Sequence, residues 1–242
     1  MNNILRVRNT AGDLVVDSDT LGTECIGKAS FSRIVQPYQE FSARQSGWSN
    51  YTFASDRTVL WAMGMPPGRR VGILGTSYLN GLHTVAVYCG ANPDGDGFDV
   101  QEPVDIWAFS TLLDSKPSPF GLILRHSVTG RLTHDFGRPN VTFPIAGGDL
   151  DSLVQLPAVG RPVAIGNSPF RHVSYSPYDP DDPRSGYVKT DTRRFLIRYE
   201  NNAVAYSSGT THRSSNENGP MPEDTTFTEP SPFFIIDGTF LP

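Results

Sequence analysis

The side chains best spaced for metal chemistry form an acidic run from Asn92 to Glu102, with Asp94, Asp96 and Asp99 between them. Calcium prefers several carboxylate and carbonyl oxygens, and glycine permits the tight bend of such a loop. The last acid stands at the eleventh place of the run, where a calcium loop has its twelfth, and no helical pattern flanks it. We therefore expect a solvated turn between two strands and assign no metal site.

The other reactive side chains do not indicate a catalytic centre. The five histidines are scattered, and His134 and Asp135 are the only adjacent pair of histidine and acid. Neighbouring residues on a strand point to opposite faces, so we expect a structural role for this pair. Motifs for a nucleophile elbow, a zinc-binding helix or a phosphate loop are missing from the sequence. The 25 acidic residues neither support nor exclude a pair of facing carboxylates for glycoside cleavage, so neither an enzyme nor a cofactor is predicted.

Aromatic residues on polar segments are the remaining candidates for binding. Trp48 and Tyr51 lie in the sequence Ser-Gly-Trp-Ser-Asn-Tyr, and Tyr178 lies in a loop rich in Asp and Pro. Exposed rings can stack on sugars or fill pockets of a protein partner, so these three residues form the candidate binding site. The alternative, which we prefer, is that the rings fix their own loops to the fold.

A framework of β hairpins must position these candidates. One pattern of strand, turn and strand occurs three times, at Ile4–Asp17, Gly121–Asp135 and Phe195–Tyr206, with Asn201-Asn202 where the first two copies carry glycine. The 23 glycines and 20 prolines exceed ordinary usage, which favours short strands and many turns. The expected fold class is all-β with little helix.

The chain is expected to divide at the segment Asp114-Ser-Lys-Pro-Ser-Pro119, which has two prolines between strand-like runs. The second hairpin copy begins directly after it. We predict an N-terminal sandwich-like domain at residues 1–113, a linker at 114–119 and a C-terminal one at 120–242. Two polar, Pro-rich stretches of the second domain, 176–183 and 212–224, are expected to be loops or partner-binding arms.

Individual strands follow from runs of β-branched and aromatic residues. Asn80-Gly81 predicts a tight hairpin turn between strands at 71–74 and 83–89. The apolar segment 232–241 should dock as a last strand, in its own chain or in a neighbour. Further strands are expected at 23–35 with an interruption at Gly27, and at 51–53, 59–63, 104–109, 153–165, 171–175, 187–189, 193–199, 203–208 and 233–237.

Charge and cysteine content limit the function classes. A net charge of −5 and a pI near 5.5 argue against a general nucleic-acid binder, which needs a basic face. Cys25 and Cys89 are expected to be free, buried thiols, because a disulfide scaffold uses more cysteines in a smaller chain. The start lacks the apolar core of a signal peptide, and no apolar run has membrane length, so synthesis in a cytoplasm without membrane insertion is expected.

Three segments carry a resemblance to a known family. Leu5-Arg-Val-Arg-Asn-Thr-Ala-Gly-Asp-Leu-Val-Val-Asp-Ser18 resembles the start of small tail-tip and baseplate-associated proteins of tailed, siphovirus-like bacteriophages. Phe120–Asp135 resembles the same hairpin, which in these proteins reads Gly-Leu-x-Val-x-Asn-x-x-Gly-x-x-x-Phe-Asp-Ser, although this chain has His134-Asp135-Phe136 at the end of it. Gly97–Phe109 is similar to a further stretch of these proteins.

The resemblance implies a structural virion protein of the tail tip or baseplate, made in the host cytoplasm and taking part in host attachment. It implies other tail and baseplate proteins as partners, and itself in a homotrimer by analogy with other tail parts. A host surface glycan or protein is a further expected partner, and no catalytic residues are carried over. The alternatives are a carbohydrate- or receptor-binding module of the tail fibre apparatus and, third, a glycan hydrolase of the same particle.

Overall fold

The described part of the chain is built from antiparallel strands and contains no helix, which confirms the all-β prediction. Consequently, no helix in this part is long and apolar enough to cross a membrane. The computed structural model describes residues 6–8, 14–17, 22–35, 47–91, 102–111, 117, 119, 121–137, 145–149, 152–157, 160–166, 168, 170–177, 187–217, 224–226 and 232–242.

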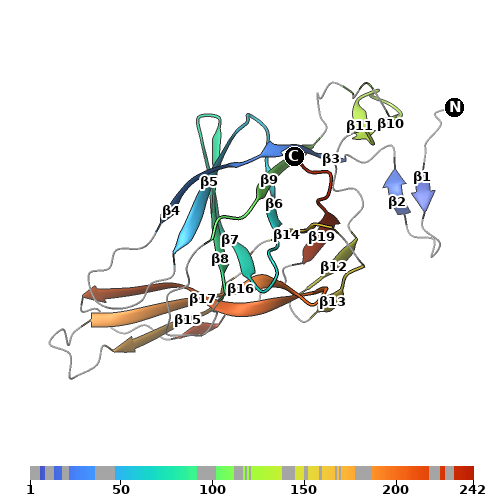
Figure 1. Ribbon diagram of the computed structural model, residues 1–242. Helices are drawn as coiled ribbons and strands as arrows, with labels where there is room; N and C mark the ends of the chain where they lie inside the picture. The colour runs from blue at the N-terminus through green and yellow to red at the C-terminus, as the bar shows by residue number, and fades with distance from the viewer. Residues whose placement is uncertain are drawn as a thin grey trace.

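Two large sheets form the body of the molecule (Figure 1). The six-stranded sheet has the order β12 (Ala146–Gly148), β19 (Phe233–Asp237), β14 (Pro162–Ile165), β6 (Leu60–Gly64), β9 (Ile106–Thr111) and β3 (Thr23–Lys28). The nine-stranded sheet has the order β13 (Leu153–Gln155), β17 (Ala203–Glu217), β16 (Tyr187–Glu200), β7 (Arg70–Leu79), β8 (Leu82–Gly90), β5 (Trp48–Ala54) and β4 (Ser30–Val35), with β15 (Phe170–Pro177) and β18 (Thr225–Thr226) branching from β16.

The two sheets pack face to face as a β-sandwich around one core. Val71, Val87 and Ile197 of the larger sheet share a buried cluster with Met63 and Phe233 of the smaller one. Such inter-sheet packing follows from the period-2 pattern of the strands, which places alternate apolar side chains on one face. In β9 both faces are buried, so the strand reads as a continuous apolar run.

The expected division of the chain at residues 114–119 is wrong, because both sheets combine strands from either side of that segment. In the smaller sheet Ala62 of β6 pairs with Ile165 of β14, and in the larger one Val71 of β7 pairs with Ile197 of β16. These ladders bury the apolar faces of both halves in a common core. The two expected domains therefore share one core in the residues that the structure describes.

Two hairpins stand apart from the large sheets and correspond to the first two copies of the repeated pattern. β1 (Arg6–Arg8) pairs with β2 (Leu14–Asp17), and β10 (Ile123–Arg125) pairs with β11 (Leu132–Asp135). Each has a register shift directly before its last pair, Arg8 with Leu14 and Arg125 with Leu132. The shared irregularity supports the interpretation of these segments as copies of one unit.

Turn chemistry places two tight hairpin turns where the sequence predicts them. Asn80 and Gly81 join β7 to β8 with φ angles of 49° and 80°. Asn201 and Asn202 join β16 to β17 with φ angles of 51° and 58°. Positive φ at both central residues is the signature of the turn that matches strand twist.

The chain passes from one sheet to the other between β3 and β4, close to the predicted interruption. Gly27 has a φ of 154° at a register shift in the pairing of β3 with β9. A Cβ atom at this position would lie 2.8 Å from the ring of Phe53, so the close approach requires glycine. β3 and β4 thereby connect the edges of the two sheets.

The apolar segment near residue 240 docks in its own chain, as the first of the two expected alternatives. β19 lies between β12 and β14, and Leu241 covers the outer face of the smaller sheet with Trp107 beneath it in the same cluster. The Trp107 indole Nε1–H donates a hydrogen bond of 2.8 Å to the Pro242 carbonyl. The guanidinium of Arg161 lies 4.4 Å from the centre of the Trp107 ring, a cation–π contact.

The larger sheet forks beside β7. β16 pairs with β7 only at Ile197 and Arg198, and from Arg194 to Val188 its partner on that side is β15. β15, β16 and β17 then run side by side away from the body, as the orange strands at the lower left of Figure 1 show. We call this three-stranded extension the arm.

Two strand boundaries predicted from the sequence differ from those in the structure. Residues 212–217, expected in a polar loop, continue β17, because they pair with Tyr187 to Thr192 of β16. Residues 153–165, expected as one strand, form β13 and β14, which belong to different sheets. Ser176 and Pro177, expected in the other polar loop, end β15, and the rest of the two loops, 178–183 and 218–223, lies outside the described residues.

Candidate functional site

Of the three aromatic residues predicted to bind a partner, the structure describes Trp48 and Tyr51, and these two lie in different surroundings. Tyr51 is only 2% exposed and belongs to the core of the sandwich. Its hydroxyl accepts a hydrogen bond of 2.8 Å from the backbone N–H of Val104, so it fixes the fold, in agreement with the preferred alternative. Tyr178 lies outside the described residues, and Trp48 is half-buried at the start of β5.

Trp48 borders a cleft of about 320 Å³ at the fork of the larger sheet. We call it the Trp48 cleft. Leu74 and Ala86 give it an apolar wall on the β7–β8 side, while Arg194 and Thr211 come from the arm. Burial lowers the pKa of Arg194, whose Nη1 donates a hydrogen bond of 2.9 Å to the Ser168 carbonyl. Because the Arg194 guanidinium is hydrogen-bonded within the chain, the Trp48 cleft is mainly apolar.

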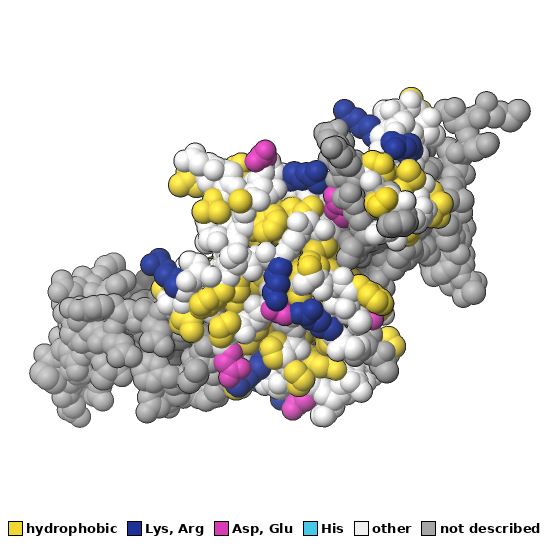
Figure 2. All heavy atoms as spheres, turned by 45° about the horizontal axis from the view of Figure 1, so that its top comes forward, with side chains coloured by type: hydrophobic (Ala, Val, Ile, Leu, Met, Phe, Trp, Pro, Cys, Tyr) yellow, Lys and Arg dark blue, Asp and Glu magenta, His cyan; other side chains and the backbone are white. Residues whose placement is uncertain are grey.

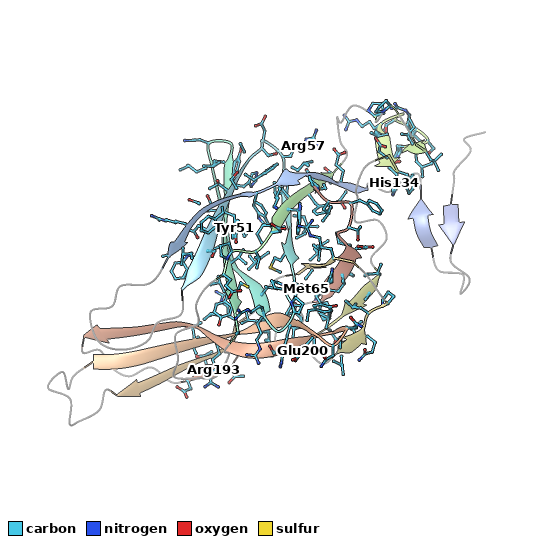
Figure 3. All side chains as sticks on the ribbon, viewed as in Figure 1. Tyr51, Arg57, Met65, His134, Arg193 and Glu200 are labelled. Carbon is cyan, nitrogen blue, oxygen red and sulfur yellow. The ribbon has the colours of Figure 1, made fainter. Side chains whose placement is uncertain are left out.

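A larger hollow of about 730 Å³ lies between the two sheets at the end of the sandwich that carries the β7–β8 turn. We call it the His83 hollow. The loop before β6 closes it on one side, and the Ser55 N–H of this loop donates a hydrogen bond of 2.9 Å to the Gly81 carbonyl. Figure 3 shows Arg57, from the same loop, at this end of the molecule. The hollow is lined by Asp56, Arg57, Thr58, Val59, Leu60, Trp61, Ile73, Thr76, Ser77, Tyr78, His83, Ile165, Gly166, Pro232 and Phe234.

Aromatic rings form one wall of the His83 hollow. The centres of the Tyr78 and His83 rings lie 4.5 Å apart with an interplanar angle of 39°, and Trp61 approaches His83 edge-on at 6.4 Å. The register of the β7–β8 hairpin causes this arrangement, because it places Tyr78 directly opposite His83. Tyr78 is 55% exposed and Phe234 is 46% exposed, so large rings face solvent at the rim.

The charges at the rim are partly neutralised. The Nη1 atom of Arg57 lies 3.3 Å from Oε1 of Glu24, a carboxylate that is almost fully buried on β3. Asp56, by contrast, is exposed beside the turn. On the face drawn in Figure 2, acidic and basic side chains lie beside each other among hydrophobic ones. The hollow thus combines apolar rings with hydrogen-bonding groups.

The structure places the His134–Asp135 pair inside the small β10–β11 hairpin. Both side chains are buried, the ring of His134 stacks on Phe136 at 6.0 Å, and Asp135 accepts a hydrogen bond of 3.0 Å from the Gly137 N–H. These contacts shape the hairpin, as expected for a structural pair.

Metal binding finds no support among the residues that the structure describes, since they contain no group of three or more His, Cys, Asp or Glu able to hold an ion. The acidic run lies outside them from Asn92 to Gln101. Its last member, Glu102, forms an ion pair with Arg69.

Sequence reasoning missed Tyr78 and His83, although a signal for them is present. A tyrosine and a histidine flank the Asn80-Gly81 turn at Tyr78 and His83, and a two-residue turn forces positions equally distant from it to face each other. No local pattern in the sequence indicates the opposite wall, which comes from β6, β14 and the segment before β19.

Comparisons with protein-family models, with curated proteins and with solved structures found no match to this chain.

Proposed function

We propose that this chain is a structural virion protein of a bacteriophage tail tip or baseplate that assembles with copies of itself, as a trimer, and with other tail proteins. The resemblance of its hairpin segments to such proteins motivates the proposal, and the arm is the structural observation that supports it best. An assembly protein needs a rigid β-rich body and strand edges that a neighbour can complete.

The outer edge of β17 is suited to such pairing. β13 covers this edge only from Ala203 to Ala205, and within the described residues no strand pairs with it from Ser207 to Glu217. On its inner side the same stretch is held by β16, so its backbone is extended and fixed. Long open edges are templates for association, and proteins that remain monomers usually shorten or cover them.

Light scattering after size-exclusion chromatography tests the proposal, with the proline variants Ser214→Pro and Ser215→Pro as a matched pair. Successive amides of a strand alternate between its two edges, so one proline removes an N–H that faces β16 and the other removes one that faces outward. We expect a stable trimer that the outward-facing proline dissociates without lowering the melting temperature. A chain that stays monomeric at all concentrations contradicts the proposal.

Host attachment is the second role that we propose, and the His83 hollow is the observation that favours it. Exposed rings beside hydrogen-bonding groups are typical of surfaces that recognise glycans or protein side chains. Because Tyr51 is buried, we place the proposed contact with the host surface at the His83 hollow, around Tyr78. No catalytic role is proposed for the His83 hollow or for the Trp48 cleft.

A further inference from the structure

We propose that the His83 hollow is a saccharide-binding site in which Tyr78 is the stacking platform. This inference deepens the proposed attachment role by naming the ligand class and its contacts. It does not require the chain to be a trimer, so it can fail or hold independently of the assembly proposal.

The platform is the first requirement of a sugar site, because one face of a pyranose ring is lined by C–H groups that pack on an aromatic ring. Tyr78 is more than half exposed at the rim of the hollow, and His83 backs its ring at 4.5 Å. This backing restricts the rotation of the Tyr78 ring before a ligand arrives. A ring that is already ordered loses less conformational entropy on binding.

Hydrogen-bonding groups at the edge of the platform are the second requirement. The Asp56 carboxylate and the hydroxyl groups of Thr76 and Ser77 line the same hollow as Tyr78. A carboxylate accepts hydrogen bonds from two neighbouring sugar hydroxyls, and serine and threonine can both donate and accept. The combination matches a ligand with an apolar face and a hydroxylated edge.

Other ligand classes fit the hollow less well. A phosphorylated ligand would place its charge near Asp56, while the nearby cation, Arg57, is already engaged by the buried Glu24 at 3.3 Å. A purely apolar ligand would cover the Asp56 carboxylate without giving it a hydrogen bond, which costs free energy. A saccharide satisfies both the rings and the polar rim.

The size and construction of the hollow also suit a short saccharide. Its volume of about 730 Å³ lies in the usual range of small-molecule sites, which is roughly 300–1,000 Å³. Trp61 of β6, Ile73 of β7 and Ile165 of β14 line the hollow, so residues from both sheets enclose it. Because paired strands hold these residues, the hollow exists before a ligand binds.

A glycan array of bacterial capsular, O-antigen and wall glycans, probed with the fluorescently labelled full chain, tests this inference. Isothermal titration calorimetry with the strongest glycan then compares four variants. We expect Tyr78→Ala to weaken binding by about tenfold or more and Asp56→Asn to weaken it by a few-fold, because stacking rings dominate such contacts. Tyr78→Phe should retain most of the affinity, and Trp48→Ala should leave it unchanged.

Trp48→Ala is the matched control, since it removes an aromatic ring of the same sheet that lies at the Trp48 cleft. Tyr78 and Asp56 are exposed, so melting temperatures close to that of the unmodified chain are expected for their variants. If Tyr78→Ala fails to fold, Asp56→Asn decides the question. An array without any bound glycan, or a loss of binding that follows Trp48→Ala and spares both Tyr78→Ala and Asp56→Asn, overturns the inference.

Discussion

The Tyr51 hydroxyl and the Val104 backbone N–H, 53 positions apart in the chain, form a buried hydrogen bond of 2.8 Å that fixes the segment before β9 against β5. Burial is the main reason why the pKa of Tyr51 is raised above its ordinary value, so the hydroxyl stays protonated across the neutral range. Figure 3 labels Tyr51 where β5 meets the core. The residue serves the fold, although its polar neighbours in the sequence suggest exposure.

Replacing Tyr51 with Phe should lower the free energy of unfolding by about 1–3 kcal/mol, because the Val104 N–H is left buried without its acceptor. Urea denaturation followed by fluorescence measures the change. Trp48→Phe, three positions from Tyr51 and on the opposite face of β5, is the control and should cost less than about 0.5 kcal/mol. Equal effects of the two substitutions would contradict the difference in their surroundings.

Asp105 gives the chain a pH-dependent contribution to stability. Its partial burial alone would raise the pKa of the carboxyl group, but hydrogen bonds and charges from Lys28, at 2.6 Å, and Arg161 outweigh that effect and lower the pKa. A carboxylate with a lowered pKa in the folded state stabilises the fold above its ordinary pKa. This stabilisation is lost as the pH falls through the lowered value.

Asp105→Asn should therefore be less stable than the unmodified chain at pH 7 and equally stable under strongly acidic conditions. Because Asp105 and Lys28 are both more than a third exposed, solvent screening limits the difference to about 1 kcal/mol or less. Denaturation at a series of pH values, repeated in high salt, measures it. A difference that persists in acid would indicate that packing, and not charge, is the cause.

The two thiols should differ in reactivity. Burial is the main reason why the pKa of Cys89 is raised to about 12, and the charge of Glu102 adds to it. Cys25 is only half-buried, with a smaller rise that is also caused mainly by burial. Since the thiolate is the reactive form, iodoacetamide at pH 8 should modify Cys25 slowly and Cys89 hardly at all.

Intact-mass measurement after alkylation checks this expectation, and both thiols should react fully in urea. Rapid modification of Cys89 in the native protein would mean that the β7–β8 region opens often, because the thiol is buried in the core there.

The fragment 1–113 should not fold alone. It contains β6 and β7 but lacks β14 and β16, so the faces around Met63 and Val71 would be exposed to water. We expect no cooperative thermal transition by circular dichroism and strong binding of a hydrophobic dye. A cooperative transition in this fragment would restore the domain boundary at residues 114–119.

Local chemistry made much of the fold predictable. The turns at Asn80-Gly81 and Asn201-Asn202 follow from the ability of these residues to adopt positive φ, and the strand at 233–237 follows from its apolar run. The repeated hairpin was recognisable because it is formed by neighbouring residues. Strand class and turn position depend on a few adjacent residues, and these are what a single sequence contains.

Long-range pairing was not predictable in the same way. The prolines at 117 and 119 mark a break in strand structure, but whether β6 pairs with β14 depends on residues about a hundred positions apart. The burial of Tyr51 was hidden because Ser49, two residues earlier on the same face, is a buried polar residue that breaks the apolar alternation of β5. For the same reason the His83 hollow, whose walls come from both sheets, could not be assembled from local patterns.

The place of β19 has a consequence for biosynthesis. It separates β12 from β14 inside the smaller sheet, so β12 cannot join β14, β6, β9 and β3 in one sheet until residues 233–237 have left the ribosome. Folding that waits for distant contacts is slow and leaves apolar faces and strand edges open for longer. A nascent chain of this topology should depend on chaperones until β19 is inserted.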